Sequence, residues 1–376
     1  MDIKYFDNAA TTAVKDEVLK EMLPYFGVDF GNPSSMYSIG RKSKRAIELS
    51  REKVAEAIGA KKEEIYFTSC GSESDNLAVK GIAYANKEKG KHIITSKIEH
   101  PAVLNTCCFL EKEGFDVTYL NVDSNGFIDL GQLNNAIRED TILISIMFAN
   151  NEIGTIEPIK EIGEIAKTRG IIFHTDAVQA IGNLRINVKE LNIDALSMSG
   201  HKFYGPKGIG ALYVKSGINF EQIQNGGHQE KNKRAGTENI AGIVGIGKAI
   251  ELAYKNFEEK NEKIKSLRDY YINEIKKRIK DIRINGDEVK RLPGNANISF
   301  KGVNGEELLF KLDAMGICAS AGSACSSGDN RPSHVLTAIG LKKEYLEGTL
   351  RVSLGVNNSK EEVDFLIDAI DKIINN

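Results

Sequence analysis

Short apolar runs rich in β-branched residues alternate with segments of helical periodicity along the first two thirds of the chain. Seven such runs predict strands, at residues 64–68, 91–96, 116–122, 141–149, 170–176, 193–199 and 209–214. The intervening segments repeat apolar residues at helical spacing, as in 72–86, 101–113 and 158–168. Near-continuous apolar strands alternating with helices predict a mostly parallel α/β sheet covered on both faces. Ligands of such sheets bind beyond the carboxyl ends of the strands.

The pattern changes about two thirds of the way along the chain. A long charged segment, 254–280, has helical spacing, and shorter strands and helices follow it to the end. The first residues have no helix of their own, so they are expected to join this later part. We therefore predict a large domain over 15–255 and a smaller α/β domain formed by 1–14 and 256–376.

Composition and charge narrow the class of protein. The 376 residues are 41% hydrophobic and 27% charged, with a formal net charge of −2, which is typical of a globular protein and favours neither nucleic acid nor a membrane surface as partner. No segment approaches the roughly 18 apolar residues of a membrane helix, and the N-terminus lacks the regions of a signal peptide. The five cysteines form no CxxC pair and no metal-ligand spacing. We expect a cytoplasmic protein in which any important cysteine acts singly.

Polar residues that a buried strand does not need follow the first two predicted strands. In TSCGSESDN, Ser72 and Asp75 resemble a capping box, and Gly71 with the free N–H groups of the helix start would make a phosphate nest. A plain capped helix is the alternative. His100 stands just before Pro101 at the next strand end, where it is either a structural loop histidine or part of a site.

The next two strand ends carry amide and carboxyl groups. Asn150, Asn151 and Glu152 directly follow a strongly apolar strand. Asp176 ends the following strand, and Gln179 comes three residues later. A buried carboxylate at this place needs a partner, which either a protonated heterocyclic nitrogen or a helix N-terminus would supply.

A lysine at the fifth strand end completes a chemical pattern. Lys202 lies 26 residues after Asp176, beside Ser199 and His201 in SGHKFYGPKGIG. A phosphate nest, a buried acid and a lysine at neighbouring strand ends match the needs of pyridoxal phosphate: helix N–H groups for its phosphate, an acid that keeps its ring nitrogen protonated, and a Schiff-base lysine. Lys207, in the turn that leads to the next strand, is interpreted as a solvated loop residue.

Two residues of the predicted smaller domain add candidate chemistry. Small residues dominate the segment around Cys325, which predicts a mobile loop at about 319–331 with one exposed thiol; an incidental surface cysteine is the alternative. Arg351 is a lone cation among apolar residues in TLRVSLG. Such an arginine needs an anion, either a substrate carboxylate or an internal salt bridge.

With these residues identified, the sequence resembles the cysteine desulfurases of the NifS/IscS type, which are class-V aminotransferases of the pyridoxal phosphate fold type I. The resembling motifs span essentially the whole chain: YFDNAATT, GNPSSMYSIGR, TSCGSESDN, EHPAV, NNEIGTIEPI, HTDAVQAIG, SGHKFYGPKGIG, RAGTEN, GSACSSG and LRVSLG. The resemblance implies pyridoxal 5′-phosphate as cofactor and removal of sulfur from L-cysteine, with L-alanine as product. The sulfur would become a persulfide on Cys325 and pass to an iron–sulfur scaffold protein of the IscU/NifU type for cluster assembly.

The resemblance also implies a role for individual residues. Lys202 would carry the cofactor, His100 would stack on its ring and assist proton transfer, and Cys325 would be the nucleophile and a transient iron–sulfur ligand. Thr237 would reach the phosphate of the neighbouring subunit, which implies a homodimer with shared active sites. The implied cofactor-binding residues are Gly71, Ser72, His100, Asn150, Asp176, Gln179, Ser199, His201, Lys202 and Thr237. The implied substrate-binding residues are Asn32, Asn150 and Arg351.

The sequence departs from the family pattern at two positions, and two alternative functions stay open. Cys70 stands where glycine is expected and Ser326 where threonine is expected. A selenocysteine lyase or another enzyme of the same fold is the nearest alternative, although an aminotransferase has no need of the loop cysteine. A non-catalytic sulfur carrier is the alternative from another class.

Overall fold

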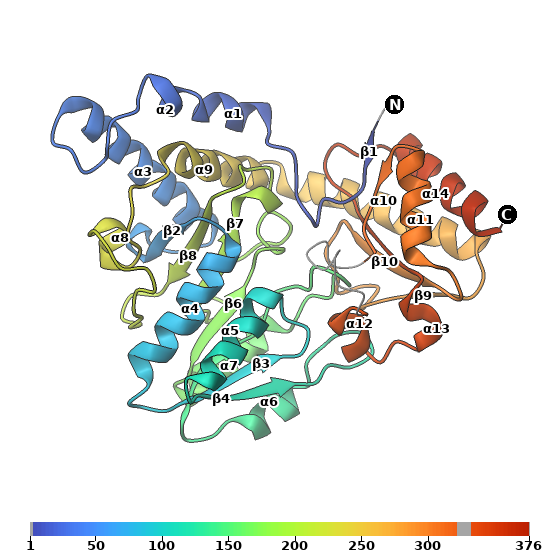
Figure 1. Ribbon diagram of the computed structural model, residues 1–376, viewed down its shortest axis with the longest axis horizontal. Coiled ribbons are helices and arrows are strands. Elements are labelled where there is room, and N and C mark those ends of the chain that lie inside the picture. Colours follow the sequence, from blue (N-terminus) through green and yellow to red (C-terminus); the bar gives the residue numbers. More distant parts are fainter. Residues whose placement is uncertain (1–2, 322–331, 376) are drawn as a thin grey trace.

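A computed structural model describes residues 3–321 and 332–375 as two α/β units that lie side by side (Figure 1). Over this described part, the larger unit contains a seven-stranded sheet, and the smaller unit contains a three-stranded sheet and a two-stranded one. None of the helices in these ranges has the length and apolar content needed to cross a membrane.

The large sheet has the strand order β2-β8-β7-β6-β5-β3-β4. Strand β8 is antiparallel to both of its neighbours, and the other pairs are parallel. The strands are β2 (Ile65–Thr68), β3 (His92–Ser96), β4 (Asp116–Leu120), β5 (Thr141–Ser145), β6 (Ile172–Asp176), β7 (Ala195–Ser199) and β8 (Gly210–Val214). Each falls within a predicted apolar run, so the prediction of a mostly parallel α/β sheet is confirmed.

Helices cover both faces of this sheet. Neighbouring strand residues pack in opposite directions: Ile93 lies in a core with Leu77 of α4, whereas Ile94 lies in a core with Ile162 of α7. Both faces are therefore dry, which explains why the strands are apolar without alternation. The helices of this unit are α1 (Asp16–Met22), α2 (Pro24–Gly27), α3 (Ser38–Ala57), α4 (Gly71–Asn86), α5 (Pro101–Lys112), α6 (Leu130–Ala136), α7 (Ile159–Arg169), α8 (Gln229–Asn232) and α9 (Ile240–Tyr254), with the 3₁₀ turns η1 (Lys62–Glu64) and η2 (Gly200–Lys202).

The smaller unit has its own core, which includes Phe6 from the N-terminal segment. Strand β1 (Lys4–Tyr5) pairs in parallel with β11 (Ile317–Cys318), so the first described residues lie against the C-terminal unit. The boundary predicted after residue 255 falls between α9 and α10. The remaining elements are α10 (Phe257–Arg278), β9 (Ile282–Ile284), β10 (Asn295–Phe300), α11 (Gly305–Ala314), α12 (His334–Ala338), α13 (Lys343–Leu346), β12 (Thr349–Ser353) and α14 (Lys360–Asn375).

Candidate active site

One pocket lies where the carboxyl ends of β6 and β7 meet the first turns of α4 and α5. Nine of the predicted site residues line it, namely Gly71, Ser72, His100, Asp176, Gln179, Ser199, His201, Lys202 and Arg351. Eight of them come from the larger unit and Arg351 from the smaller one, so the pocket lies between the two units.

The start of α4 forms an anion-binding wall of this pocket. Gly71 is the first residue of the helix, and the first N–H groups of a helix have no partner within it. A side chain at Gly71 would place its Cβ 2.8 Å from the Val178 side chain, so the close approach requires glycine here. The Ser199 hydroxyl is buried and has no hydrogen-bond partner within the described ranges. This donor set fits a phosphate group.

The helix cap differs from the one the sequence suggests. The N-cap is Cys70, whose thiol accepts a hydrogen bond from the Glu73 N–H at 3.4 Å. Asp75 makes no cap: it is 1% exposed and lines the pocket from below the first turn. The capping-box interpretation of Ser72 and Asp75 is therefore wrong, because helix periodicity turns Asp75 toward the sheet.

Two buried carboxyl groups face each other at the base of the pocket. Asp176 ends β6 and accepts a hydrogen bond from the Val178 N–H at 2.9 Å. Oxygens of Asp75 and Asp176 and a ring nitrogen of His100 all lie within 4.8 Å of one another. Burial raises the pKa of Asp176, and the positive charges of His100 and Lys202 partly counteract this rise. Burial and the negative charge of Asp176 raise the pKa of Asp75 well above its usual value. The cluster of Asp75, Asp176 and His100 can balance the charge of one cation, either a metal ion or a protonated ring nitrogen.

His100 combines two of the roles weighed from the sequence. It is the N-cap of α5, with its Nδ1 atom accepting a hydrogen bond from the Ala102 N–H at 3.1 Å. Pro101 takes the first helical position, where a missing N–H costs nothing. The cap fixes the ring at the pocket wall and leaves its Nε2 atom for a ligand.

Lys202 lies in the pocket and Lys207 does not. The Lys202 ammonium donates to the Ala9 carbonyl at 2.6 Å and to the Ala10 carbonyl at 2.8 Å. Burial, together with the charges of the two lysines, lowers the pKa of His201 to about 4, so this imidazole adds no charge at neutral pH. Lys207 is exposed in the following turn, as interpreted from the sequence.

Arg351 forms the internal salt bridge that was one of the two alternatives weighed from the sequence, and it also lines the pocket. It is 1% exposed on β12 and forms an ion pair with Asp7, with an Nη2–Oδ1 distance of 2.8 Å. Its Nη1 donates to the Asn151 carbonyl at 3.1 Å. The same guanidinium lines the pocket, so the internal salt bridge does not remove it from the site.

The remaining predicted residues lie elsewhere. The Asn150 amide is buried in a turn, where it donates to the Ile98 carbonyl at 2.8 Å and accepts from the Glu152 N–H at 2.9 Å; its neighbour Asn151 lines the pocket instead. Asn32 and Thr237 are exposed and do not line this pocket. Cys325 and most of the loop predicted at about 319–331 lie outside the described residues.

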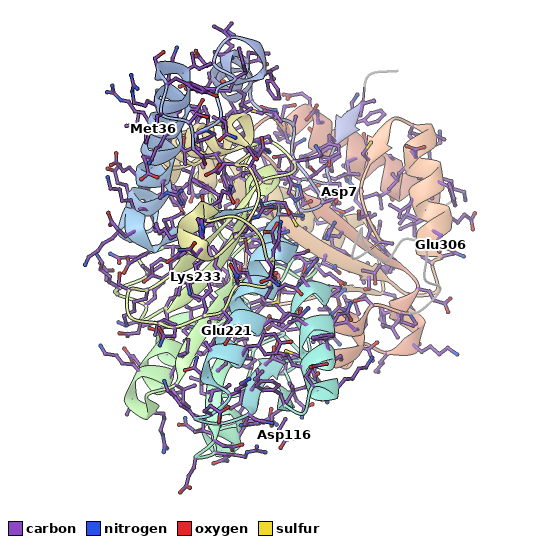
Figure 2. The ribbon with its side chains drawn as sticks, turned by 60° about the vertical axis from the view of Figure 1, so that its left-hand side comes forward. Asp7, Met36, Asp116, Glu221, Lys233 and Glu306 are labelled. Carbon is purple, nitrogen blue, oxygen red and sulfur yellow. The ribbon has the colours of Figure 1, made fainter. Side chains whose placement is uncertain are left out.

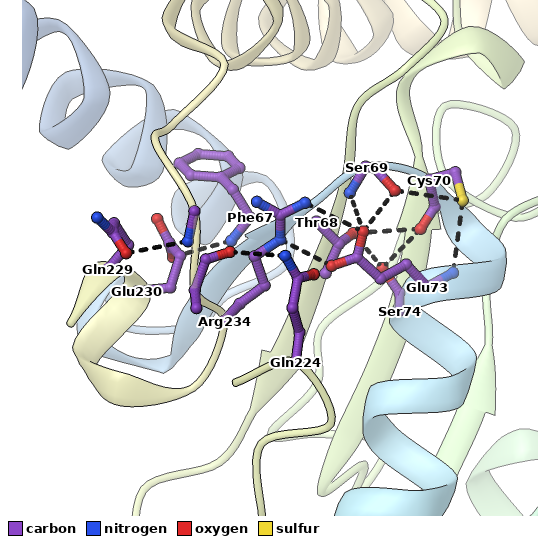
Figure 3. A network of polar contacts seen from close by, with 12 residues as sticks. Phe67, Thr68, Ser69, Cys70, Glu73, Ser74, Gln224, Gln229, Glu230 and Arg234 are labelled. Atoms are coloured by element: carbon purple, nitrogen blue, oxygen red, sulfur yellow. Dashed lines mark hydrogen bonds and ion pairs between the residues drawn. The ribbon is translucent and has the colours of Figure 1, made fainter. Parts of the chain in front are cut away.

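An ion pair joins the segment that carries Thr237 to the start of α4 (Figure 3). The Glu73 carboxylate accepts from the Arg234 Nε at 2.8 Å and from the Ser69 N–H at 2.7 Å. Deeper in the same network, Glu230 accepts from the Phe67 N–H at 2.9 Å. Glu73 and Arg234 stand 161 residues apart, so no local sequence signal could have paired them.

Glu230 also forms a buried ion pair with Arg51, at 2.7 Å between Nη1 and Oε2. The backbone of Glu230, Lys231 and Asn232 is left-handed, with φ between 43° and 63°. Three such residues in a row are costly without glycine. Within this turn the Glu230 carboxylate is anchored by the Arg51 ion pair and by the hydrogen bond from the Phe67 N–H.

Comparison with known proteins gives consistent results over the whole chain. The family model "Aminotransferase class-V" matches residues 4–366. The curated protein "Cysteine desulfurase IscS" of Clostridium botulinum (strain Hall) is 59% identical over 372 residues, covering 98% of this chain and 94% of that protein. The solved structure "NIFS-LIKE PROTEIN" is 37% identical with a TM-score of 0.94 and full coverage of both chains. "SspA in complex with cysteine" is 42% identical with a TM-score of 0.84, covering 95% of this chain and 100% of that one.

Proposed function

This chain belongs to the aminotransferase class-V family and is a cysteine desulfurase, and we propose that it uses pyridoxal 5′-phosphate, Lys202 and Cys325 to remove sulfur from L-cysteine. The observation that supports these roles is the convergence of Lys202, Asp176 and the start of α4 in one pocket, with Arg351 at its edge. The SspA structure is described as a complex with cysteine, which supports the same amino acid as substrate here.

The pocket suits the cofactor at both of its ends. Pyridoxal phosphate, when bound, supplies an electron sink for a carbanion next to its ring. The N–H groups of Gly71 and Ser72 and the Ser199 hydroxyl would hold the phosphate. The Asp176 carboxylate would balance the protonated ring nitrogen, which in turn would offset the desolvation that raises its pKa.

The groups that handle protons and orient the ring come from three strand ends. Lys202, whose ammonium is held over the Ala9 and Ala10 carbonyls, would carry the cofactor and then act as the base at the substrate α-carbon. His100 would stack on the ring and assist this proton transfer. Gln179 lines the same wall and would bond the phenolic oxygen of the ring.

Sulfur removal itself falls to Cys325. Its thiolate would attack the substrate sulfur, so that a sulfur–sulfur bond forms while the carbon–sulfur bond breaks. The electron pair of the broken bond stays with the carbon fragment, which is released as L-alanine after protonation. Arg351 would hold the substrate carboxylate. Asn151, rather than Asn150, is the asparagine whose position in the pocket wall suits cofactor or substrate binding.

The proposed homodimer has support in one apolar surface. Between residues 19 and 39, several large apolar side chains are exposed in the single chain: Leu23, Phe26, Val28, Phe30 and Met36. Met36, at the outer edge of the molecule in Figure 2, is 90% exposed. Burial of such a surface against a second copy is favourable. In the resulting dimer Thr237, which is exposed in the single chain, would reach the site of the partner subunit. Asn32, in the same region, would lie near the shared sites.

The sulfur acceptor and the setting follow from the same proposal. An iron–sulfur scaffold protein of the IscU/NifU type would take the persulfide sulfur from Cys325, and that thiolate could ligate the iron–sulfur centre transiently during transfer. A reducing cytoplasm would keep the cysteines available for this chemistry.

The decisive experiment adds L-cysteine and a reductant to the purified protein and follows alanine, sulfide and the visible spectrum together. We expect one alanine for each sulfide, and no persulfide in Cys325→Ala although this variant keeps its yellow, borohydride-sensitive cofactor. Cys108→Ala, which removes an exposed thiol on α5, is the matched control. Wild-type sulfur transfer by Cys325→Ala would refute the role of Cys325. Faster alanine release from selenocysteine than from cysteine would favour a lyase.

A further inference from the structure

A carboxylate from the N-terminal segment is engaged on both of its oxygens beside Arg351. Asp7 lies where the two units meet (Figure 2). Its Oδ1 atom pairs with the Arg351 Nη2 at 2.8 Å, and its Oδ2 atom accepts a hydrogen bond from the Ser320 hydroxyl at 2.7 Å. We propose that Asp7 is a positioning residue, which holds the Arg351 guanidinium in the orientation that recognises the carboxylate of an amino acid. The inference rests on the proposed function, in which Arg351 binds that carboxylate.

Three chain segments lock this carboxylate in place. Ser320 and Arg351 pair through their backbones, with the Arg351 N–H donating to the Ser320 carbonyl at 2.6 Å. The backbone of Asp7 bridges to Ser353, also on β12. The Tyr5 hydroxyl donates to the Asp7 carbonyl at 3.0 Å. The backbone and both side-chain oxygens of Asp7 are therefore held by contacts. The carboxylate of a typical surface ion pair lacks this support.

The guanidinium keeps donors for a ligand after these contacts are made. Its Nη2 reaches Asp7 and its Nη1 reaches the Asn151 carbonyl at 3.1 Å. The buried Nε has no partner among residues 3–321 and 332–375. An arginine binds a carboxylate best through two parallel N–H groups, which requires a fixed plane. Asp7 and the Asn151 carbonyl together fix that plane before the ligand arrives.

Asp7 has two opposing effects on the binding of an anion by Arg351, and substitutions that differ in charge and in shape separate them. Its negative charge weakens the attraction of Arg351 for a second anion, whereas its contact prevents the side chain from losing its orientation. Asparagine at position 7 would keep an oxygen for the guanidinium without the charge. Alanine would remove both. A positioning role therefore predicts that Asp7→Asn binds an amino-acid carboxylate at least as tightly as the parent and that Asp7→Ala binds it more weakly.

The test compares two ligands of the holoenzyme, L-alanine and ethylamine, which differ by the carboxylate. Binding is read from the visible absorbance, and the KM for L-cysteine is measured alongside. We expect Asp7→Ala to raise the dissociation constant of L-alanine and the KM by about tenfold, with that of ethylamine changed less than about threefold. Asp7→Asn should bind ethylamine like the parent and L-alanine at least as tightly as the parent. Asp140→Ala, which breaks a surface ion pair with Arg138 at 2.8 Å, is the matched control and should change neither.

Equal losses for both ligands, tighter L-alanine binding by Asp7→Ala, or an equal defect in Asp7→Asn would overturn the inference. If Asp7→Ala does not fold, Asp7→Ser is measured instead, since its hydroxyl is too short to reach the guanidinium. Absence of alanine formation from L-cysteine by the parent enzyme would refute the proposed function. The contrast between L-alanine and ethylamine would still decide the role of Asp7, because it depends on binding alone.

Discussion

Glu99 is a buried acid that precedes the pocket-lining His100 in the chain, and its replacement by glutamine tests the electrostatics of this buried region. The side chain is 0% exposed, and its Oε1 accepts hydrogen bonds from the Ser96 hydroxyl at 2.6 Å and the Met147 N–H at 2.9 Å. Its Oε2 has no partner within the described part of the chain. Glu99→Gln keeps an oxygen for both hydrogen bonds and removes the ionisable proton, so it isolates the effect of charge.

The magnitude follows from the pKa of the buried group. Burial raises the pKa of Glu99 from 4.5 to about 8, and the charge of Asp176 adds to this effect. The folded protein thus binds this proton more tightly than the unfolded chain. Below the pKa of Glu99 in the unfolded chain, this proton stabilises the folded state in full. As the pH rises toward 8, the unfolded chain releases the proton first, and the free energy of unfolding falls by about 1.4 kcal/mol for each pH unit. Between pH 5 and pH 8 the parent should lose about 4 kcal/mol that Glu99→Gln retains.

The assay is urea unfolding of the cofactor-free protein across this pH range, followed by circular dichroism, for the parent, Glu99→Gln and the control Glu113→Gln. Glu113 is exposed at the end of α5, so its replacement should leave the pH dependence unchanged. We expect the difference in free energy of unfolding between Glu99→Gln and the parent to grow steadily with pH. A difference that stays constant, or that falls as the pH rises, would show that Glu99 is ionised in the folded protein and would refute the reasoning.

Three further predictions concern the lysine proposed to carry the cofactor, a buried ion pair and the apolar surface. Lys202→Ala should lose the borohydride-reducible cofactor while Lys207→Ala keeps it, as read by mass spectrometry of the labelled peptide; the reverse pattern would contradict the assignment. Glu230→Ala removes the buried partner of Arg51 at 2.7 Å, leaves it only the half-exposed Glu48 at 3.2 Å, and should lower the free energy of unfolding by about 3–5 kcal/mol. Arg51→Met with Glu230→Leu should recover part of this loss, because no charge is then left unpaired, although the buried Phe67 N–H still lacks its acceptor. A loss under about 1 kcal/mol in the single variant would argue against this pair. Met36→Glu should shift the protein toward the monomer in analytical ultracentrifugation, and an unchanged mass would place the dimer contact elsewhere.

Much of the fold was predictable because its rules are local. Apolar runs at strand length, separated by helical spacing, are sufficient to predict all seven strands of the large sheet. The carboxyl-end rule then identifies where Asp176 and Lys202 must meet, and the structure places both in one pocket. Lys207 could be set apart from the sequence alone, since it lies in a turn rather than at a strand end.

Predictions that needed the direction of one side chain were less secure. Asn150 and Asn151 are adjacent and chemically identical, yet one is consumed by a turn and the other lines the pocket. Asp75 matched a local capping pattern, whereas helix geometry turns it into the base of the site. Sequence order does not record which way a side chain points where the backbone leaves a strand or enters a helix.

The sequence by itself determined the element types, the mostly parallel sheet and the strand ends whose polar residues line the pocket, Lys202 among them. These features depend on periodicity and residue type over short distances. Only the tertiary structure decided how the site is held together. The contact of Asp7 with Arg351 joins residues 344 positions apart, and that of Glu73 with Arg234 joins residues 161 apart. Such ion pairs depend on distances of a few ångströms between segments that only the packed chain brings together.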